Sequence, residues 1–246
     1  MRNVLRQAGL KACKKVKKPA LISRHRKARL NFAQKHKEWI IEDWKKVIWS
    51  DETKINWICS DGIHYTWRKP QPGLAGRGIV PTLKFGGGNI MIWGCMAWSG
   101  PGAMVQVVGK MNAQQYISIL QENLTLCMEA ASLLQDMPPA DQLIFQQDND
   151  LKHTARATTS FLRSMDIKCL DWPAQSPDLN PIEHLREELK RRLGTYHEPP
   201  KGVGELWQQV QREWALIPAS TCRNLIESMA RRIEAVLAAK GGNTRY

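Results

Sequence analysis

The sequence predicts an α/β fold in which antiparallel strands are followed by alternating strands and helices and then by C-terminal helices. Short β-rich runs lie in the first two thirds of the chain, near-continuous apolar segments such as residues 89–100 are typical of buried strands, and amphipathic stripes begin after Pro181. With 246 residues, 43% of them hydrophobic, the chain can form one sizeable domain with a full core.

The predicted strands are bounded by turn residues and are rich in β-branched and aromatic side chains. They lie within residues 45–54, 62–70, 89–100, 102–109, 142–149 and 167–172. The first is predicted to end at Asp51, the segment 89–100 to be a buried central strand paired with 102–109, and the segment 142–149 to lead to Asp148. Residues 70–88 are dense in Gly and Pro, and a loop of that length is typically functional.

The predicted helices follow apolar residues spaced by three and four positions. They cover residues 31–44, 113–134, a segment from about 154, and the C-terminal segments 182–193, 203–217 and 225–237. The division that follows is a basic arm over residues 1–46 and a main domain over residues 47–246.

Positive charge is concentrated at the N-terminus. Residues 1–46 hold 15 Lys and Arg against three acids, so this segment carries +12 of the total +13. Such an arm favours a polyanion partner, because counterion release drives binding to phosphates whatever the nucleotide sequence. The alternative is a solvated tail or a tail that carries a localisation signal. Deleting residues 1–30 is then expected to flatten the salt dependence of duplex DNA binding.

Other function classes fit the composition less well. The six cysteines lie more than thirty positions apart, which is not the spacing of a zinc knuckle or a redox motif. No apolar run reaches the roughly 18 residues that span a bilayer, and the basic arm lacks the wide apolar face of a membrane-surface helix. A soluble intracellular protein is expected.

Three acids are candidates for chemistry. Asp51 and Asp148 follow apolar strand runs, and Glu183 lies in the first turn of a predicted helix. Carboxylates at one sheet rim suit two Mg²⁺ ions that cleave a phosphodiester. Each acid also has a structural alternative: strand-end acids often cap loops, and Glu183 could close a capping box by reaching back to the Asn180 backbone N–H. His153 could contact DNA or water near Asp148, or be a structural histidine.

Three blocks resemble the signature motifs of Tc/mariner superfamily transposases: WSDETK, FQQDND followed by KHT, and WPAQSPDLNPIEHL. Between Asp148 and Glu183 lie 34 residues, the spacing that marks one large branch of that superfamily. The resemblance extends to RHRKARLNFAQKHKEW, to KFGGGNIMIWGCMAWSGPG and to the closing SMARRIEAVLAAKGGNTRY, so it runs essentially from end to end.

The resemblance implies an RNase H-like mixed sheet flanked by helices, with the family's Asp, Asp and Glu on Asp51, Asp148 and Glu183 as catalytic residues and ligands of Mg²⁺ or Mn²⁺, two ions in all. It implies hydrolysis at the ends of a transposon in double-stranded DNA and attack of the freed 3′-hydroxyl on a TA target, in the nucleus. Residues 70–88 resemble the family's clamp loop, which contacts a partner subunit and so implies a homodimer. No membrane and no small-molecule cofactor are implied.

The basic stretch 11–29 resembles the family's DNA-binding linker. The residues expected to contact DNA are Lys14, Lys15, Lys17, Lys18, Arg24, Arg26, Lys27 and Arg29. Upstream, the chain is expected to keep only the last turns of the family's second helix-turn-helix unit, so sequence-specific recognition should be lost while phosphate binding survives.

Three positions beside the candidate acids depart from the family pattern. Leu151, His184 and Arg186 stand where the family usually has proline, asparagine and tryptophan. Two functions therefore compete: a transposase catalytic domain, and a catalytically inactive DNA-binding remnant. An RNase H or resolvase-type nuclease is disfavoured by the spacing of the acids and by the clamp-like loop.

Overall fold

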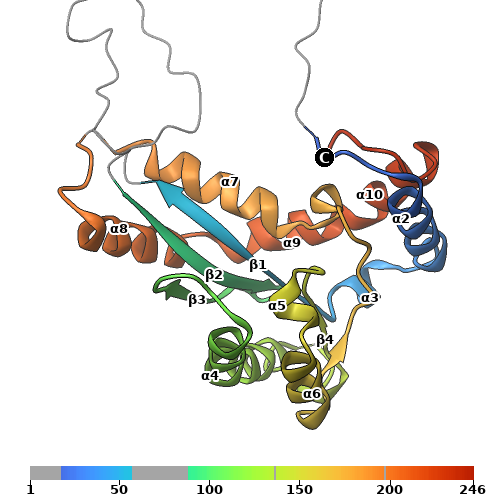
Figure 1. Ribbon diagram of the computed structural model, residues 1–246, viewed down its shortest axis with the longest axis horizontal. Helices are drawn as coiled ribbons and strands as arrows, with labels where there is room; N and C mark the ends of the chain where they lie inside the picture. Colours follow the sequence, from blue (N-terminus) through green and yellow to red (C-terminus); the bar gives the residue numbers. More distant parts are fainter. Residues whose placement is uncertain (1–17, 57–87, 136, 197) are drawn as a thin grey trace, which may run out of the picture.

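The computed structural model describes residues 18–56, 88–135, 137–196 and 198–246, which form a mixed five-stranded sheet between helices (Figure 1). The strands are β1 (Val47–Asn56), β2 (Asn89–Ala97), β3 (Gly100–Val107), β4 (Ile144–Gln146) and β5 (Lys168–Cys169). Their order is β3-β2-β1-β4-β5; the β1–β2 and β2–β3 pairs are antiparallel, and the β1–β4 and β4–β5 pairs are parallel. The predicted pairing of the 89–100 and 102–109 strands is confirmed.

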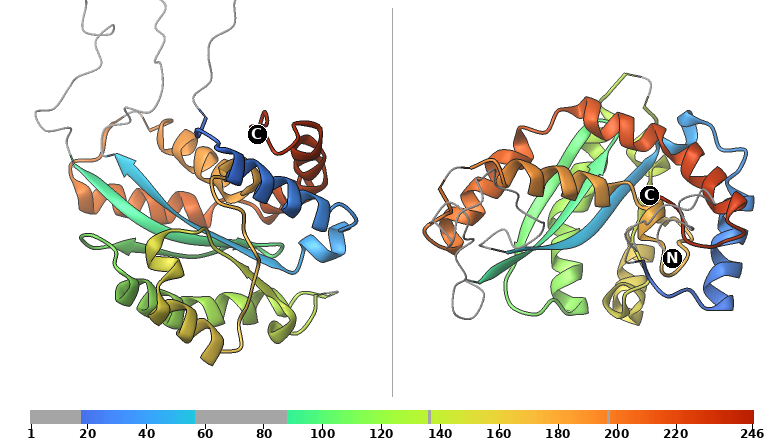
Figure 2. Two further views of the ribbon diagram at one scale, coloured as in Figure 1. Left: turned by 45° about the vertical axis from the view of Figure 1, so that its right-hand side comes forward. Right: turned by 90° about the horizontal axis from the view of Figure 1, so that it is seen from above.

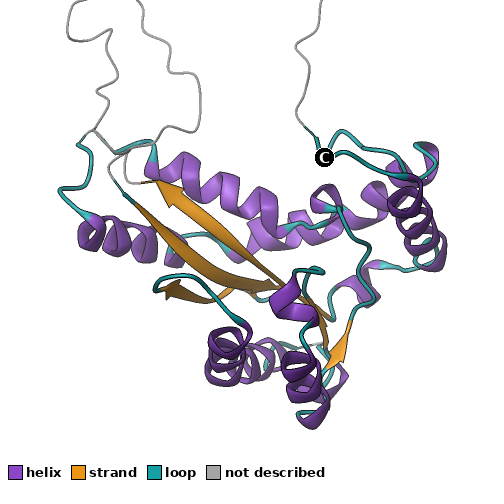
Figure 3. Cartoon of the chain, viewed as in Figure 1, coloured by secondary structure: helices purple, strands orange, loops and turns teal. Residues whose placement is uncertain are grey.

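The helices cover both faces of the sheet (Figures 2 and 3). One layer contains α4 (Ala113–Ser132), α5 (Leu151–Thr154) and α6 (Arg156–Ser164). The other contains α7 (Ile182–Leu193), α8 (Val203–Ala215), α9 (Ala219–Glu227) and α10 (Met229–Ala238). The segment α2 (Ser23–Lys35) packs against α10, and α3 (Ile41–Trp44) leads into β1. Single 3-10 turns, η3 (Ala140–Gln142) and η4 (Pro177–Leu179), precede β4 and α7.

Alternation along the strands produces one hydrophobic core on each face of the sheet. Successive strand side chains point to opposite faces. In β1, Trp49 packs with the α7–α10 layer, whereas its neighbour Ile48 packs with α4 and α6. In β2, Ile92 and Trp93 divide between the two cores in the same way. The near-continuous apolar run in β2 therefore reflects burial on both faces.

The predicted basic arm is part of this core where the structure describes it. Phe32, Ala33 and Trp44 are buried in the same cluster as Trp49, so residues 18–46 share the core of the domain predicted to begin at residue 47. The helix α2 also begins at Ser23, within the stretch expected to be a DNA-binding linker. Deleting residues 1–30 would remove residues 23–30 of this thirteen-residue helix, more than its first two turns, and a different test of DNA binding is needed.

Three predicted elements have different bounds in the structure. The predicted helix 31–44 is divided into the end of α2 and the short α3, with residues 36–40 between them. The strand β1 continues past Asp51 to Asn56, because residues 52–56 go on pairing with β2. The predicted helix 225–237 is divided between α9 and α10 at Ser228, whose hydroxyl donates to the Leu225 carbonyl at 2.6 Å. The predicted strand 62–70 and most of the clamp-like loop 70–88 lie outside the described residues. No described helix is long and apolar enough to cross a membrane.

Candidate active site

Asp51 and Asp148 leave two adjacent parallel strands at equivalent positions. The parallel pairing of β1 with β4 ends at the Trp49–Gln146 pair, and each acid lies two residues beyond its member of that pair. A spacing of two residues along a strand preserves the direction of the side chain. The carboxyl ends of parallel strands are where open α/β sheets bind ligands. Strand register thus brings together two acids that are far apart in sequence.

Glu183 reaches the same region from α7, which packs against β1. The capping-box interpretation of this residue is wrong. The Asn180 backbone N–H donates to the Pro177 carbonyl at 3.0 Å, and no side chain caps the start of α7. The Glu183 carboxylate instead lies 3.1 Å from the guanidinium of Arg186, one turn further along the helix.

The three acids line one cavity of about 380 Å³. Residues 172–177 and Asn180 form another part of its wall. The remaining lining residues are Pro19, Glu52, Asn149, Asp150 and Arg186. Five carboxylates therefore border the cavity against a single guanidinium. Among the described residues, however, no group of three or more His, Cys, Asp or Glu side chains is arranged to hold one metal ion.

Asp51 is paired with Arg186. The Arg186 Nη1 lies 2.6 Å from Asp51 Oδ2, and Asn180 Nδ2 is 3.4 Å from the same oxygen. Burial raises the pKa of Asp51 to about 7; the Arg186 guanidinium opposes this shift, whereas the Glu183 and Glu52 carboxylates add to it. Burial thus contributes more to this rise than the charges of the neighbouring acids do.

Asp148 is held by His153. The His153 Nδ1 lies 2.6 Å from Asp148 Oδ1 and its Nε2 lies 3.0 Å from Glu52 Oε1, so a protonated imidazole donates to both carboxylates. Burial alone would lower the pKa of His153, but these two hydrogen bonds raise it to about 9. Burial opposes ionisation of Asp148 too, yet the hydrogen bonds from His153 and from the Asp150 N–H lower its pKa.

This arrangement settles the role left open for His153. Its side chain is 2% exposed, and its ring packs against Tyr116 with 4.2 Å between the ring centroids. His153 is not among the residues that line the cavity, so it orients Asp148 from the protein interior. Glu52, which also forms an ion pair with Lys152 at 3.5 Å, was not among the predicted site residues. The only sequence signal for Glu52 is its position directly after Asp51.

The residues expected to contact DNA differ in their surroundings. Arg24, Arg26 and Lys27 are exposed on α2, and the exposed Lys18 donates to the main-chain oxygen of Tyr246. Lys14, Lys15 and Lys17 lie outside the described residues.

Arg29 requires a correction, because its side chain is fully buried. Its guanidinium forms two hydrogen bonds with Asp178, at 2.6 and 2.7 Å, and donates to the carbonyls of Gln175, Gly241 and Gly242. A guanidinium enclosed in this way cannot reach a phosphate.

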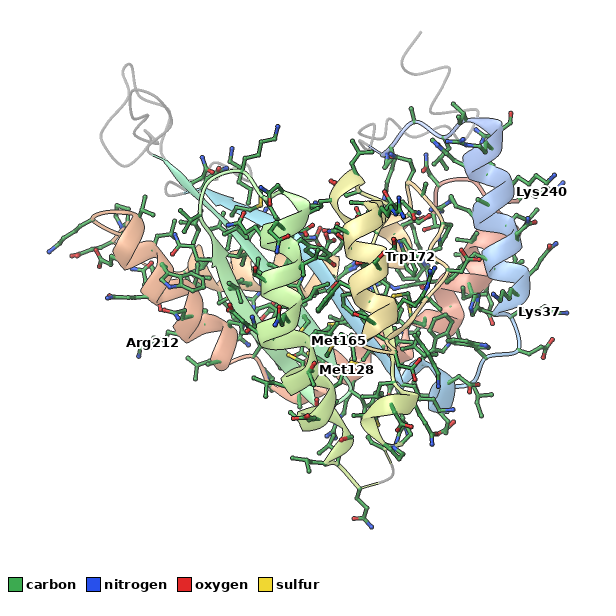
Figure 4. All side chains as sticks on the ribbon, turned by 60° about the horizontal axis from the view of Figure 1, so that its bottom comes forward. Lys37, Met128, Met165, Trp172, Arg212 and Lys240 are labelled. Carbon is green, nitrogen blue, oxygen red and sulfur yellow. The ribbon has the colours of Figure 1, made fainter. Side chains whose placement is uncertain are left out.

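A second cavity, of about 510 Å³, lies beside α2 and shares lining residues with the first. Arg24, His25 and Lys35 line one side of it, and Asn149 and the 172–174 segment line the other side and also border the carboxylate cavity. Trp172 packs edge-on against Phe32 of α2, with 5.3 Å between ring centroids, and lies on the side of the molecule that carries α2 (Figure 4). Basic side chains of α2 therefore line a cavity that borders the carboxylate cavity.

Comparison with known proteins identifies the family. A helix-turn-helix family model described as "Transposase" matches residues 1–38, and one described as "DDE superfamily endonuclease" matches residues 46–202. The chain is 39% identical over 251 residues to the Transposable element Tcb1 transposase of Caenorhabditis briggsae, covering 100% of this chain and 87% of that protein. It is also 39% identical over 246 residues to the Transposable element Tc1 transposase of Caenorhabditis elegans, with the same coverage.

A solved structure shares the fold. The Mos1 mariner paired end complex with Mn superposes with a TM-score of 0.80 at 19% identity, covering 99% of this chain and 71% of that chain. This likeness confirms the predicted RNase H-like mixed sheet flanked by helices. Together with the two family models and the two transposases of nematodes, it leads to one assignment. The chain belongs to the Tc1/mariner family of DNA transposases, whose DDE endonuclease domain carries out transposition and strand transfer.

Proposed function

We propose that Asp51, Asp148 and Glu183 are the metal ligands and catalytic residues of this transposase and that they hold Mg²⁺ or Mn²⁺, as two ions. The observation that carries the proposal is that three acids from β1, from the segment after β4 and from α7 line one cavity. The Mos1 complex with Mn supports the choice of ion, since that structure shares the fold.

The donor set fits such ions. Carboxylate oxygens are the ligands that Mg²⁺ prefers, and five acids border the cavity. The Asn180 Oδ1, beside Asp51, is buried without a hydrogen-bond partner among the described residues, and it is an oxygen donor of the same kind. Bound divalent cations activate an attacking oxygen and stabilise the leaving one in phosphodiester cleavage.

The chain's own groups position this chemistry. The imidazole of His153 fixes the orientation of Asp148, and its other nitrogen is held by Glu52. Packing of α7 on β1 places Glu183 near Asp51. We infer that a DNA strand reaches the carboxylates through the second cavity, where Arg24 and Lys35 can bind its phosphates. The first reaction is hydrolysis at the transposon end, and the second joins the freed 3′-hydroxyl to a TA target.

The partners follow from this function. The substrate is double-stranded DNA, and the two transposon ends of one reaction are held together by a homodimer of this chain, as the paired ends of the Mos1 complex suggest. Action on chromosomal DNA places the protein in the nucleus.

One observation favours the alternative of an inactive DNA-binding remnant: Arg186 already neutralises part of the charge of Asp51 and Glu183. A nicking and strand-transfer assay on pre-cut transposon ends with Mn²⁺ separates the two functions, because pre-cut ends remove the need for end recognition. A transposase joins such ends to target DNA only when the metal is present. A remnant binds them and leaves them unchanged.

DNA binding is expected to depend on the exposed face of α2. Replacing Arg24, Arg26 and Lys27 together by Gln should reduce the slope of log affinity against log salt by up to about 3, because each lost phosphate contact contributes about 0.9. Fluorescence anisotropy with an arbitrary duplex over a range of salt concentrations measures this slope.

The matched control removes three exposed cations elsewhere: Lys110, Lys201 and Arg212 replaced by Gln. Arg212 lies at the opposite end of the molecule from Lys37 and Lys240, which mark the α2 and α10 side (Figure 4). The control has the same net charge but should keep the parent slope more closely. Equal slopes for the two triple variants would show that α2 is not the DNA-binding surface.

A further inference from the structure

One cation already lies between two of the candidate metal ligands. The same nitrogen of Arg186, Nη1, is 2.6 Å from Asp51 Oδ2 and 3.1 Å from Glu183 Oε2. The Arg186 side chain is 10% exposed, so water screens this contact poorly. The guanidinium thus occupies the space between the two carboxylate oxygens.

A divalent cation bound to both acids needs that space. Mg²⁺ lies about 2.1 Å from its oxygen ligands, closer than any N–H donor approaches an oxygen. The positive guanidinium and the ion would also repel each other at contact distance. Asp51 and Glu183 can therefore bind Arg186 or share a metal ion, but they cannot do both.

The guanidinium is held incompletely. Its Nε is buried with no hydrogen-bond partner among the described residues, although arginine offers five N–H donors. The contact with each acid uses Nη1 and is not the parallel two-bond pairing that arginine forms at its strongest sites. Arg186 also lines the carboxylate cavity, so its long side chain has room to move when it is displaced.

We propose that Arg186 is an internal competitor of the metal: its guanidinium must leave Asp51 and Glu183 before a divalent ion can bind between them. This inference rests on the proposed metal site. Its consequence is that the chain binds Mg²⁺ and Mn²⁺ more weakly than the same site would with a neutral residue at position 186. Arg186 thereby sets the metal concentration at which the enzyme becomes competent.

The experiment measures metal binding directly, by calorimetric titration of the metal-free protein with MnCl₂ and by its melting temperature with and without Mn²⁺. The test variants are Arg186→Met and Arg186→Gln, which remove the charge while keeping an unbranched side chain. Arg186→Lys keeps the charge. Arg191→Met is the matched control, because it removes an exposed arginine of the same helix that pairs with Glu188 outside the cavity.

The two neutral variants should bind Mn²⁺ at least about tenfold more tightly than the parent, a difference of about 1.4 kcal/mol. Without metal they should melt below the parent, since Asp51 then lacks its partner, and Mn²⁺ should raise their melting temperatures more than that of the parent. Arg186→Lys and Arg191→Met should stay near the parent Kd. If Arg186→Met does not fold, Arg186→Gln retains a side chain that can hydrogen-bond to both acids and decides the question.

Two failures are distinguishable. Equal Mn²⁺ affinity in the parent and the neutral variants, together with loss of binding in Asp51→Asn, overturns the role of Arg186 and leaves the metal site standing. Absence of Mn²⁺ binding in the parent and in both neutral variants overturns the metal site itself. Tighter binding in Arg191→Met to the same degree would reduce the effect to net charge and would also overturn the proposal.

Discussion

Replacing Glu183 by Gln is expected to reduce nicking and strand transfer by at least about 1,000-fold. Loss of one metal-ligating carboxylate removes several kcal/mol of stabilisation from the transition state, and each 1.36 kcal/mol is a factor of ten in rate. Asp51→Asn and Asp148→Asn should have effects of the same size, because the three acids line one cavity. Both reactions should be lost together, since one site performs both.

The control for this comparison is Glu187→Gln. Glu187 lies one turn beyond Glu183 on the same helix and is exposed outside the cavity, so the same chemical change should leave both rates within about twofold of the parent. Nicking is measured on an uncut transposon end and strand transfer on a pre-cut end, both by gel electrophoresis, and the melting temperature confirms that each variant is folded. If Glu183→Gln nicks and joins DNA at the parent rate, the assignment of Glu183 as a metal ligand is wrong.

The local parts of the fold could be predicted because each depends on residues that are close together in the sequence. The apolar run of β2 and the three- and four-residue spacing of α7 are set by burial of each element on its own. The positions of the candidate acids after strand runs and within the first turn of a helix left a structural alternative open for each, and the resemblance to Tc/mariner transposases selected them as catalytic residues. Their meeting in one cavity depends on the β1–β4 register, which only the folded chain defines.

The errors come from partners that are distant in sequence. Arg29 was predicted to contact DNA because it ends a basic stretch, and nothing near it indicates that Asp178 would bury its charge. Glu52 was missed because its partner His153 lies 101 positions away. The departure from the family pattern at Arg186 was visible in the sequence, but the sequence does not show that its guanidinium binds two of the acids.

The second large effect is expected at the buried pair of Arg29 and Asp178. Their side chains are 0% and 5% exposed, and Asp178 also accepts hydrogen bonds from the N–H and hydroxyl of Thr244. Arg29→Met should lower the free energy of unfolding by about 3–5 kcal/mol, because it leaves a buried carboxylate without its cation. For a chain of this size the melting temperature should fall by about 10 °C. Arg24→Met, on the exposed face of the same helix, should change it little.

The pH dependence of this difference identifies its origin. Burial opposes ionisation of Asp178, but the hydrogen bonds and charge of Arg29 and the hydrogen bonds from Thr244 lower its pKa below the usual value. A carboxyl whose pKa is lowered by folding stabilises the protein above its unfolded pKa of about 4 and loses that contribution as the pH falls further. The gap in unfolding free energy between the parent and Arg29→Met should therefore be largest at high pH and shrink as the pH falls, because Asp178, left buried without its cation in the variant, takes up a proton at a higher pH than in the parent. A gap that is constant with pH would assign the loss to packing.

Arg29→Met also separates the structural role of α2 from its DNA-binding role. Arg29 joins α2 to η4 and to the carbonyls of the C-terminal Gly241 and Gly242, and η4 leads directly into the start of α7, which carries Glu183. Below its melting temperature, the variant should keep the salt slope of DNA binding, since a fully buried guanidinium contacts no phosphate. It should lose nicking activity, because the support of the segment before Glu183 is weakened. A reduced slope in Arg29→Met, with the helix intact by circular dichroism, would restore Arg29 to the DNA-contacting residues and contradict its assignment to the buried pair.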